Sequence, residues 1–464
     1  MVSPFYHTPI LKIIKMKYIV NILLITFTAV VLTACESKTQ DQKQAQDSKA
    51  DAYLDTIQLQ TINYFWKEAD KTLSGLAPER VHMDNIYPQN DANVITTGGS
   101  GFGLMALIAG IDRGFIEKEA GLKRFERIVS FLEKADRFHG AWPHWMDGNT
   151  GKVVPFSKND DGGDLVETSF LMQGLLTVQA YYKKHDSARA QDLVSRIQTL
   201  WEEVEWSWYT QGKEVLYWHW SPTNGWKMNF AVGGYNECLI MYVLAASSPT
   251  YPISAEVYHK GWARNGTLSS DAELYGIPTV VDYYQHNDAK IGPLFWAHYS
   301  YLGLNPFKLS DRYADYGQLT TNHAKIHLAY AIDNPKNFKG YGEDMWGLTS
   351  SYSMKGYAGH RPGNDLGVIA PTAALSSMPY LPMNSQKMLV NLYENHKDLI
   401  GAYGPYDAFS FQEDWMLPRY LAIDQGPIPV MIENYRSGLL WELFMSNTEV
   451  QQGLRRLGFT IKEK

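Results

Sequence analysis

The feature that most constrains the fold is a long succession of helical segments with no strands alternating between them. Apolar residues recur at helical spacing in about a dozen stretches. A chain of this kind excludes a doubly wound α/β sheet, and no fixed-period repeat is visible that would indicate a consensus solenoid. We therefore predict an all-α protein whose helix hairpins close into an (α/α)6 barrel. The expected helices cover 101–112, 118–135, 166–182, 188–205, 384–396, 414–422, 432–445 and 449–457, and others begin near 51, 235, 293 and 320.

Long loops dense in Gly, Trp, Tyr and Asp separate these helices. The longest cover 139–163, 341–365 and 401–411. Irregular loops of this length in a compact domain are usually functional. In a barrel they would form a cleft over the inner helices at one end. One short β-hairpin is also expected, with strands at 214–220 and 226–231.

The N-terminus has the pattern of an export signal. Three lysines precede an apolar run at 18–31, which is too short for a confident membrane span. The run ends in Leu-Thr-Ala-Cys, which resembles the bacterial lipobox. We expect residues 1–35 to be a signal peptide whose Cys35 becomes lipidated, although a plain signal peptide is the alternative. Residues 36–50 are polar and predict a disordered tether, and 51–464 would form one domain.

The most informative stretch is 160–176, where an acidic, glycine-rich loop leads directly into an apolar helix. Asp164 and Glu167 are three residues apart, so their carboxylates would lie on one helix face with Cβ atoms about 5 to 6 Å apart. The same spacing is that of a capping box, in which Asp164 accepts a first-turn N–H and Glu167 reaches back. Both interpretations stay open. Paired carboxylates in an aromatic cleft are typical of enzymes that hydrolyse glycosidic bonds.

Aromatic residues are frequent, with 14 Trp and 30 Tyr. Exposed rings suit ligands that are apolar on one face and hydroxylated at the edge, as sugars are. Trp142 and Trp145 flank a Pro-His pair just before the acidic loop, and Trp218 lies in the expected hairpin. We expect these three rings to bind substrate; packing within loops is the alternative.

Two further acids lie next to glycines. Glu237 begins an apolar helix, a setting that would favour its neutral form, although a first-turn acid is also favoured by the helix dipole. Asp424 lies on a Gly-Pro turn that we expect to be open to solvent. Both are candidate catalytic groups.

Three more side chains are candidate substrate ligands. His360 and Arg361 could donate hydrogen bonds to sugar hydroxyls, unless they are merely solvated loop residues. Glu433 is the third, and pairing with Arg436, three residues later, is its alternative role.

Composition and motifs exclude several classes of function. The formal net charge of -7 gives no indication of nucleic-acid binding. Residues 147–151 resemble the start of a calcium loop, but its twelfth position is Lys158 rather than glutamate. Zinc, Walker and serine-hydrolase motifs are absent from the sequence. We expect no metal and no cofactor. The body contains a single cysteine, Cys238, which we expect to be a buried hydrophobe.

Five stretches together resemble a known family. They are NYFW at 63–66, DLVETSFLMQGLL at 164–176, GGYNE at 233–237, IAPTAALSSMPY at 369–380 and AIDQGPIPVMIENYRSGLLW at 422–441. In this order they look like the glucoamylase-like domain of glycoside hydrolase family 144, the β-1,2-glucanases, from about residue 51 onward. The resemblance implies an (α/α)6 barrel, anomer-inverting hydrolysis and no metal. It places cleft acids at Asp164, Glu167, Glu237 and Asp424. Residues 249–292 are hard to match, so endo versus exo action stays open.

We therefore expect a monomeric, lipid-anchored enzyme of the cell envelope, periplasmic or on the outer-membrane surface, that shortens β-1,2-glucan to sophorose or short sophoro-oligosaccharides. Glu237 is the expected general acid and Asp424 the base, because Asp164 and Glu167 are too close in sequence to flank the bond. The alternatives are a non-catalytic surface glycan-binding lipoprotein, or a hydrolase or lyase of another polysaccharide. Clustered acids argue against a binder of neutral glycan.

Overall fold

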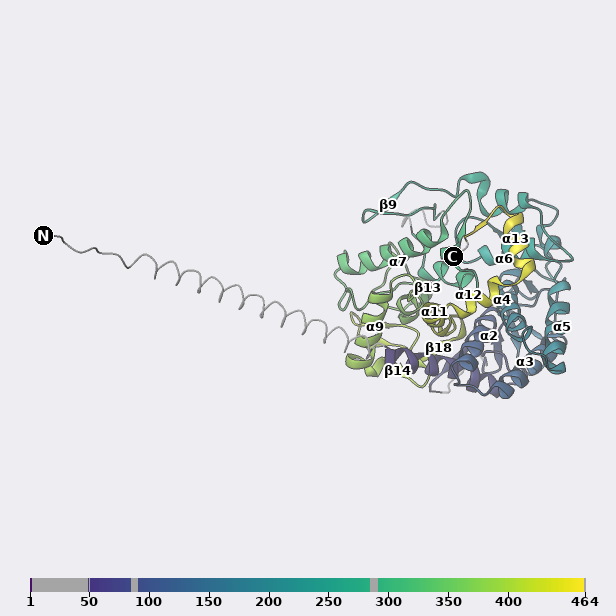
Figure 1. Cartoon of the computed structure of the whole chain (residues 1–464), viewed down its shortest axis with the longest axis horizontal. Coiled ribbons are helices and arrows are strands. Elements are labelled where there is room, and N and C mark those ends of the chain that lie inside the picture. The colour runs from purple at the N-terminus through teal and green to yellow at the C-terminus, as the bar shows by residue number, and fades with distance from the viewer. Residues whose placement is uncertain (2–48, 50, 85–90, 284–290, 463–464) are drawn as a thin grey trace. The chain divides into compact units, whose positions relative to one another are not determined.

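The structure is a computed structural model that describes residues 1, 49, 51–84, 91–283 and 291–462. The expected signal peptide, including Cys35, lies outside the described residues except for Met1. The expected tether lies outside them except for residue 49. Residues Leu54–Lys464 form one compact unit, which is mainly helical (Figure 1). Within the described ranges, no helix combines the length and apolar character needed to cross a bilayer.

Inner and outer helices differ in how much of their surface is buried. Helices α2 (Thr97–Asp112), α4 (Leu165–Tyr182) and α6 (Leu239–Ser247) are buried on almost every side, which is typical of helices enclosed by others. Helices α3 (Lys118–Leu132), α5 (Ala188–Glu202) and α13 (Thr448–Arg456) bury one stripe and expose charged residues. In Figure 1, α3 and α5 lie at the periphery, outside α2 and α4. The predicted (α/α)6 barrel is confirmed.

The other helices follow the expected order along the chain, and most begin or end within a few residues of the predicted positions. They are 51–67, α7 (Tyr316–Asp333), α8 (Pro371–Leu375), α9 (Pro382–Asn395), α10 (Ala422–Gln425), α11 (Pro427–Arg436) and α12 (Leu439–Met445). The helix expected at 432–445 is two helices, because Gly438 between them has a φ of 73°. Near residue 293 two short 3-10 helices form instead, η5 (Leu294–Ala297) and η6 (Tyr299–Leu302). The remaining short helices are η1 (Glu68–Lys71), η2 (Trp206–Thr210), the π-helix η3 (Val257–Trp262), η4 (Arg264–Gly266), η7 (Pro306–Lys308) and η8 (Lys397–Leu399).

The prediction of a helix at 414–422 is wrong. This segment forms β17 (Trp415–Met416) and β18 (Arg419–Leu421), and α10 begins only at Ala422. Pro418 lies in its middle, and a proline removes a backbone donor and disfavours helix at the preceding residue. Strand β18 pairs antiparallel with β1 (Arg80–His82), which lies near the other end of the chain.

The expected hairpin forms only in part. Strand β6 (Leu216–Tyr217) pairs with β8 (Ala231–Val232). Strand β7 (His219–Trp220) pairs instead with β5 (Gly163–Asp164), so that Asp164 lies opposite His219. The acidic loop is thereby fixed to a segment about fifty residues further along the chain.

Other short strands connect the loops above the helices. Strands β2 (Val94–Thr96), β3 (Trp145–Asp147) and β4 (Val153–Val154) form a three-stranded sheet, and β12 (Ser350–Ser353) pairs with β13 (Gly356–Gly359). The rest are β9 (Glu273–Leu274), β10 (Ile277–Pro278), β11 (Leu309–Ser310), β14 (Ile400–Gly401), β15 (Gly404–Pro405), β16 (Phe409–Ser410) and β19 (Thr460–Ile461).

Helices α2 and α4 meet at two glycines. A Cβ atom added to Gly174 would lie 2.2 Å from the carbonyl oxygen of Gly101, and one added to Gly101 would lie 2.0 Å from that of Phe170. Only residues without a side chain allow the two backbones to approach this closely. The contact determines how α4, which carries Glu167, lies against α2.

We predict that Gly174→Ala lowers the unfolding free energy by at least about 1 to 3 kcal/mol, the usual cost of overpacking a core, because the obstructing atom is backbone. Urea denaturation should show it. Gly342→Ala is the matched control, since its Cβ would meet only Asp344 Oδ1, at 3.8 Å. A Gly174→Ala variant as stable as the wild type would show that the helices can separate without cost.

Candidate active site

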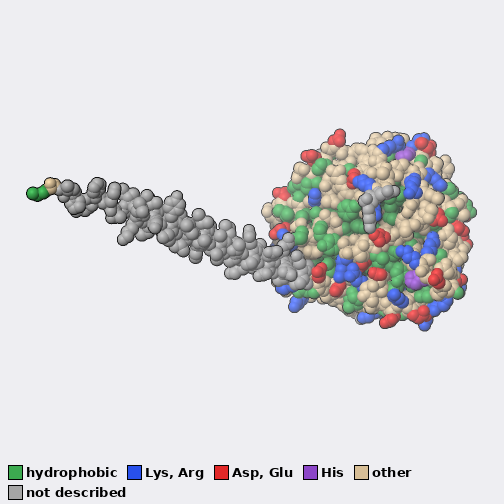
Figure 2. Space-filling view, viewed as in Figure 1, with side chains coloured by type: hydrophobic (Ala, Val, Ile, Leu, Met, Phe, Trp, Pro, Cys, Tyr) green, Lys and Arg blue, Asp and Glu red, His purple; other side chains and the backbone are tan. Residues whose placement is uncertain are grey.

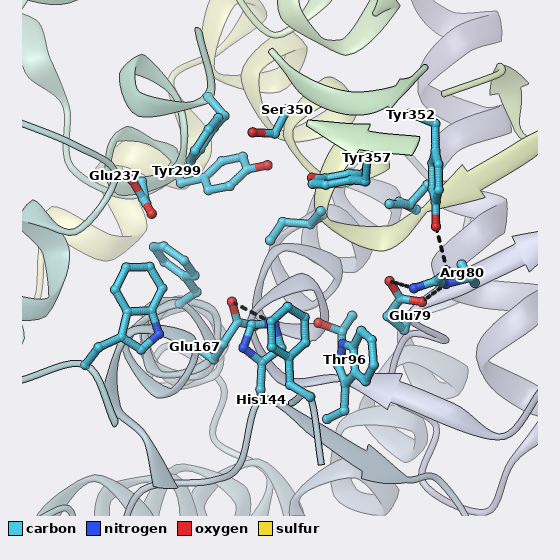
Figure 3. A pocket seen from close by; sticks show the side chains of 17 residues that line it. Glu79, Arg80, Thr96, His144, Glu167, Glu237, Tyr299, Ser350, Tyr352 and Tyr357 are labelled. Atoms are coloured by element: carbon cyan, nitrogen blue, oxygen red, sulfur yellow. Dashed lines mark hydrogen bonds and ion pairs between the residues drawn. The ribbon is translucent and has the colours of Figure 1, made fainter. Parts of the chain in front are cut away.

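A cavity of about 380 Å³ opens at the loop end of the barrel. Its side chains come from strands β1, β2, β3, β12, β13 and β18, from helices α4 and α10, and from the loops before α6 (Figure 3). Eight of the lining residues, apart from His144, are aromatic: Trp145, Phe156, Phe170, Trp218, Phe295, Tyr299, Tyr352 and Tyr357. Three carboxyl side chains also face it, those of Glu79, Glu167 and Glu237. The cavity is therefore an aromatic cleft containing acids.

Asp164 is fully buried at the start of α4 and organises the groups around it. Its Oδ1 accepts a hydrogen bond from the Glu167 N–H at 2.9 Å. Its Oδ2 accepts from Trp218 Nε1 at 2.9 Å and lies 2.9 Å from His144 Nδ1. Asp164 thus caps the helix, as one interpretation of the sequence expected, but it does not line the cavity. Its N–H donates to the Trp142 carbonyl rather than to Glu167.

His144 lies between two carboxylates. Burial alone would lower the pKa of its imidazole, but Glu167 and Asp164 outweigh that effect and raise the pKa to about 9. Nε2 lies 4.0 Å from Glu167 Oε1, and Phe156 stacks on the ring at 4.0 Å between centroids. His144 is therefore an imidazolium at neutral pH.

Glu167 turns away from the helix cap and faces the cavity. Burial raises its pKa to about 7, and the charge of Asp164 adds to the rise, while His144 and the Gly98 N–H oppose it. The Gly98 N–H, in the first turn of α2, donates to Oε2 at 2.7 Å. A Cβ at Gly98 would lie 2.5 Å from that oxygen. Glycine is therefore required there for this bond.

Glu237 faces the cavity from the segment just before α6. Burial raises the pKa of its carboxyl group to about 7, and the charges of Glu167 and Asp164 add to the rise. Its backbone is fixed by Ser300, whose hydroxyl donates to the Glu237 carbonyl and accepts from the Ile240 N–H at 3.0 Å. The expectation of an acid in an apolar setting is confirmed in this respect.

A second cavity of about 360 Å³ adjoins the first. The two share Trp218, Glu237, Phe295 and Ser350. Arg361 lines the second cavity, together with Asn236, Trp296 and Asn364. Glu237 therefore lies where the two cavities meet, and a chain-like ligand can extend past it in both directions.

Three of the expected substrate-binding residues lie elsewhere. Trp142 is fully buried, with its Nε1 donating to the Leu132 carbonyl at 3.2 Å, so it belongs to the core and cannot stack on sugar. His360 is also buried and lines neither cavity. Glu433 is fully buried in a two-bond ion pair with Arg113, at 2.7 and 3.0 Å. It therefore joins helices and does not bind substrate, and its partner is not Arg436.

Asp424 is not on an open turn. It is buried within α10 beside Asp407 and borders only a void of about 10 Å³ behind the cavity wall. Burial and the neighbouring Asp407 raise the pKa of Asp424 well above its usual range. The open Gly-Pro turn expected from the sequence does not exist, because Gly426 and Pro427 continue from α10 into α11.

Several lining residues were not foreseen. Glu79, Arg80, Tyr299, Tyr352 and Tyr357 all face the cavity. Glu79 and Arg80 reach it because β1 pairs with β18, and Tyr352 and Tyr357 face each other across the β12–β13 pair. No local pattern indicates such long-range pairing. The density of tyrosine in 341–365 was the one available signal.

One group of side chains has the spacing of a metal site. His144, Asp160 and Asp164 offer ligand atoms that all lie within 4.8 Å of one another. A histidine must be neutral to bind a metal, whereas His144 has a pKa of about 9. Asp164 Oδ2 already accepts from Trp218 and His144. These residues fit a hydrogen-bonded network better than a metal.

The raised pKa of Glu237 predicts how the stability of the protein depends on pH. A carboxyl group whose pKa rises on folding favours the folded state below its unfolded pKa of 4.5, and this contribution is lost as pH rises through about 7. Glu237→Gln should therefore stabilise the protein more at about pH 8 than at about pH 4, by roughly 3 kcal/mol. Thermal melts across this range measure the difference.

The control for this prediction is Glu343→Gln. The Glu343 side chain is 60% exposed, so substitution there should change the unfolding free energy by no more than about 0.5 kcal/mol. A Glu237→Gln effect that does not change with pH would mean that folding does not raise the pKa of Glu237.

The chain is similar to proteins of a known family. The family model Glycoamylase, described as "Putative glucoamylase", matches residues 229–448. The chain is 44% identical over 454 residues to an exo β-1,2-glucooligosaccharide sophorohydrolase (non-reducing end) from Parabacteroides distasonis, covering 92% of this chain and 61% of that protein. The chain thus spans about three fifths of the length of that relative.

Solved structures agree over the domain. An endo-β-1,2-glucanase from Chitinophaga pinensis, in complex with sophorotriose and glucose, is 59% identical with a TM-score of 0.86, covering 89% of this chain and 98% of that chain. The β-1,2-glucanase from Parabacteroides distasonis is 43% identical with a TM-score of 0.83, covering 88% of this chain and 60% of that chain. Because identity this high extends over almost the whole of the Chitinophaga chain, this chain belongs to the glucoamylase-like β-1,2-glucanase family, glycoside hydrolase family 144.

Proposed function

We propose that this protein hydrolyses β-1,2-glucan to sophorose or short sophoro-oligosaccharides with inversion of the anomeric centre. The observation that carries the proposal is a pair of carboxyl groups with raised pKa values, Glu167 and Glu237, that line one aromatic cavity. Relatives that are named for β-1,2-glucan hydrolysis support the linkage.

Glu237 is the proposed general acid. Its pKa of about 7 keeps about half of it protonated at neutral pH and most of it protonated below neutral pH, as a proton donor to the leaving oxygen must be. It lies at the junction of the two cavities, so that a bound chain can place a glucosyl residue on each side of it. Donation of its proton would release the leaving group as a neutral alcohol.

Glu167 replaces Asp424 as the proposed general base. Asp424 does not line the cavity and could accept a proton only through intervening groups. Glu167 lines the cavity, and the His144 imidazolium and the Gly98 N–H both stabilise its ionised form. Its carboxylate would take a proton from the water that attacks the anomeric carbon. Asp164 orients His144 and the first turn of α4.

The two acids titrate as a pair. Ionisation of Glu167 raises the pKa of Glu237, so loss of the first proton makes loss of the second harder. The singly protonated pair is the form that inverting hydrolysis needs. We therefore expect a bell-shaped pH profile, with activity lost on the alkaline side as Glu237 ionises.

A non-catalytic glycan-binding protein is the second candidate. It would need the rings and hydroxyls of the cleft but no buried carboxyl groups of raised pKa, which cost folding free energy. A lyase would need cations that face uronates, whereas the cationic side chains of the described cavity wall, Arg80 and His144, already pair with acids. The site therefore favours a hydrolase of a neutral glycan.

Substitution of the acids tests this mechanism. Glu237→Gln and Glu167→Gln should each lower kcat on linear β-1,2-glucan by at least about 10², the lower range for acid–base catalysis, while the melting temperature is kept. Asp424→Asn should cost less, because Asp424 has no direct contact with the cavity. Reducing-end assays and thin-layer chromatography measure turnover and products.

Starch and cellulose serve as control substrates and should remain intact. Equal activity on an α-1,4-glucan would overturn the linkage while leaving a hydrolase. Near-normal turnover by a folded Glu237→Gln variant would remove Glu237 as the acid. A larger loss from Asp424→Asn than from Glu167→Gln would return the base to Asp424.

We also propose that the protein is anchored to a membrane of the cell envelope through lipid on Cys35. The lysine-flanked apolar run and the Leu-Thr-Ala-Cys motif support this. Cys35→Ala should move the protein from the membrane fraction to the soluble fraction, as immunoblotting of fractionated cells would show. The matched control is Cys238→Ala, since Cys238 is buried in the domain. A Cys35→Ala protein that stays in the membrane pellet contradicts the anchor.

A further inference from the structure

Glu79 and Arg80 form a charged pair in the cavity wall that the proposed hydrolysis does not use. Arg80 donates to both oxygens of Glu79, through Nε and through Nη2, the latter at 3.0 Å. Its Nη1 donates to the Tyr352 hydroxyl at 2.6 Å. Both charged side chains are about nine-tenths buried, at 12% and 11% exposed. Figure 3 shows the pair at one end of the cavity and Glu237 at the other.

Stability does not explain this pair. Taking two charges out of water costs several kcal/mol, and an apolar pair of similar volume is often as stable. Burial raises the pKa of Glu79 even though Arg80 opposes the rise, so the ion pair does not fully offset the cost of burial. Arg80 also bonds Tyr352 in β12 and lies 3.5 Å from Asp91 Oδ2. Its bonds to Glu79, the preceding residue, join no distant parts of the fold, so the Glu79 carboxylate is not needed to hold these segments together. A function in the cavity is the better explanation.

The pair retains hydrogen-bonding capacity beside flat rings. A guanidinium has five N–H groups and each carboxylate oxygen has two lone pairs, and the bonds within the pair and to Tyr352 use three N–H groups and one lone pair on each oxygen. The Arg80 guanidinium carbon lies 5.8 Å from the centre of the Trp145 ring and 5.9 Å from that of Tyr352. Donors, acceptors and rings are thus presented together, as sugar recognition needs.

We propose that Glu79 and Arg80 bind the C3–C4 diol of a glucosyl residue remote from the bond that is cut. The inference rests on the proposed function. In a β-1,2-linked unit, C1 and C2 carry the linkages, so C3 and C4 hold the only adjacent free hydroxyls. One hydroxyl donates to Glu79 and the other accepts from Arg80, both as charge-assisted bonds. Units linked β-1,3 or β-1,4 lack one of these hydroxyls, so the pair also selects the linkage.

The test uses the double variant Glu79→Gln/Arg80→Met, which removes both charges of the pair so that neither is left without the other. Asp91, whose Oδ2 lies 3.5 Å from Arg80 Nε, loses that cation, so a thermal melt accompanies the kinetics. Its kinetics are measured on a ladder of linear β-1,2-gluco-oligosaccharides. For chains that reach the pair, kcat/KM should fall about ten- to a hundred-fold, as for loss of hydrogen bonds to charged groups. The loss should appear mainly in KM and should be smallest for the shortest chain that is cleaved.

The matched control is Glu133→Gln/Arg196→Met. Arg196 donates two bonds of 2.7 Å to Glu133 between the outer helices α3 and α5, far from the residues that line the cavity. This variant should match the wild type at every chain length. Tyr352→Phe is the second variant at the site, in case the double variant melts early; it keeps both charges, loses the bond that orients Arg80 and should raise KM for long chains several-fold.

Each outcome decides the proposal. Wild-type KM at every length, in the folded double variant, would make the pair purely structural and leave the hydrolase intact. An equal loss at all lengths would place the pair at the cleaved bond and overturn the remote position. If the wild type cleaves no member of the ladder, the proposed function fails. Calorimetric binding of the same chains to Glu237→Gln, with and without the double substitution, then decides whether the diol is bound.

Discussion

The rest of the site depends on one buried carboxylate, that of Asp164. It caps α4 through the Glu167 N–H, accepts from Trp218 and binds His144, so that three segments far apart in sequence converge on one side chain. The pairing of β5 with β7 places Trp218 within reach. The two oxygens of Asp164 take part in all three contacts, and the carboxylate does not line the cavity. Its charge then keeps His144 protonated beside Glu167.

This arrangement lowers the folding stability of the protein. Glu167 and Glu237 are both buried, and burial is the largest cause of their raised pKa values. A protein selected only for stability would place apolar side chains there. The close contact of α2 with α4 at Gly101 and Gly174 holds together the two helices that carry Gly98 and Glu167, the donor and the acceptor of one hydrogen bond in the cavity wall.

The fold and the catalytic acids were predictable to different extents. Long helices such as α4 and α5 can be predicted because the spacing of their apolar residues is a local pattern. Glu167, in the first turn of α4, is found from the same pattern. Most of the strands were not predictable: β1 and β18, for example, are only three residues long and pair across more than half of the chain. For the same reason, Trp142 and Asp424 were wrongly predicted to face the cleft. Whether a ring or a carboxylate faces a cleft or the core depends on packing partners that spacing does not reveal.

The distribution of charge along the cavity separates binding from catalysis. A neutral glycan brings no charge to neutralise a buried ion, so every ion in the cavity wall must be compensated by the protein itself. Arg80 compensates Glu79, and His144 compensates Glu167. Among the described residues that line the cavity, Glu237 is the carboxyl group without a cationic partner in an ion pair. A carboxyl group in that position lowers its free energy by retaining its proton. The absence of a counter-ion thus suits Glu237 to the proposed role of general acid, while its paired neighbours suit the proposed roles of base and hydroxyl ligand.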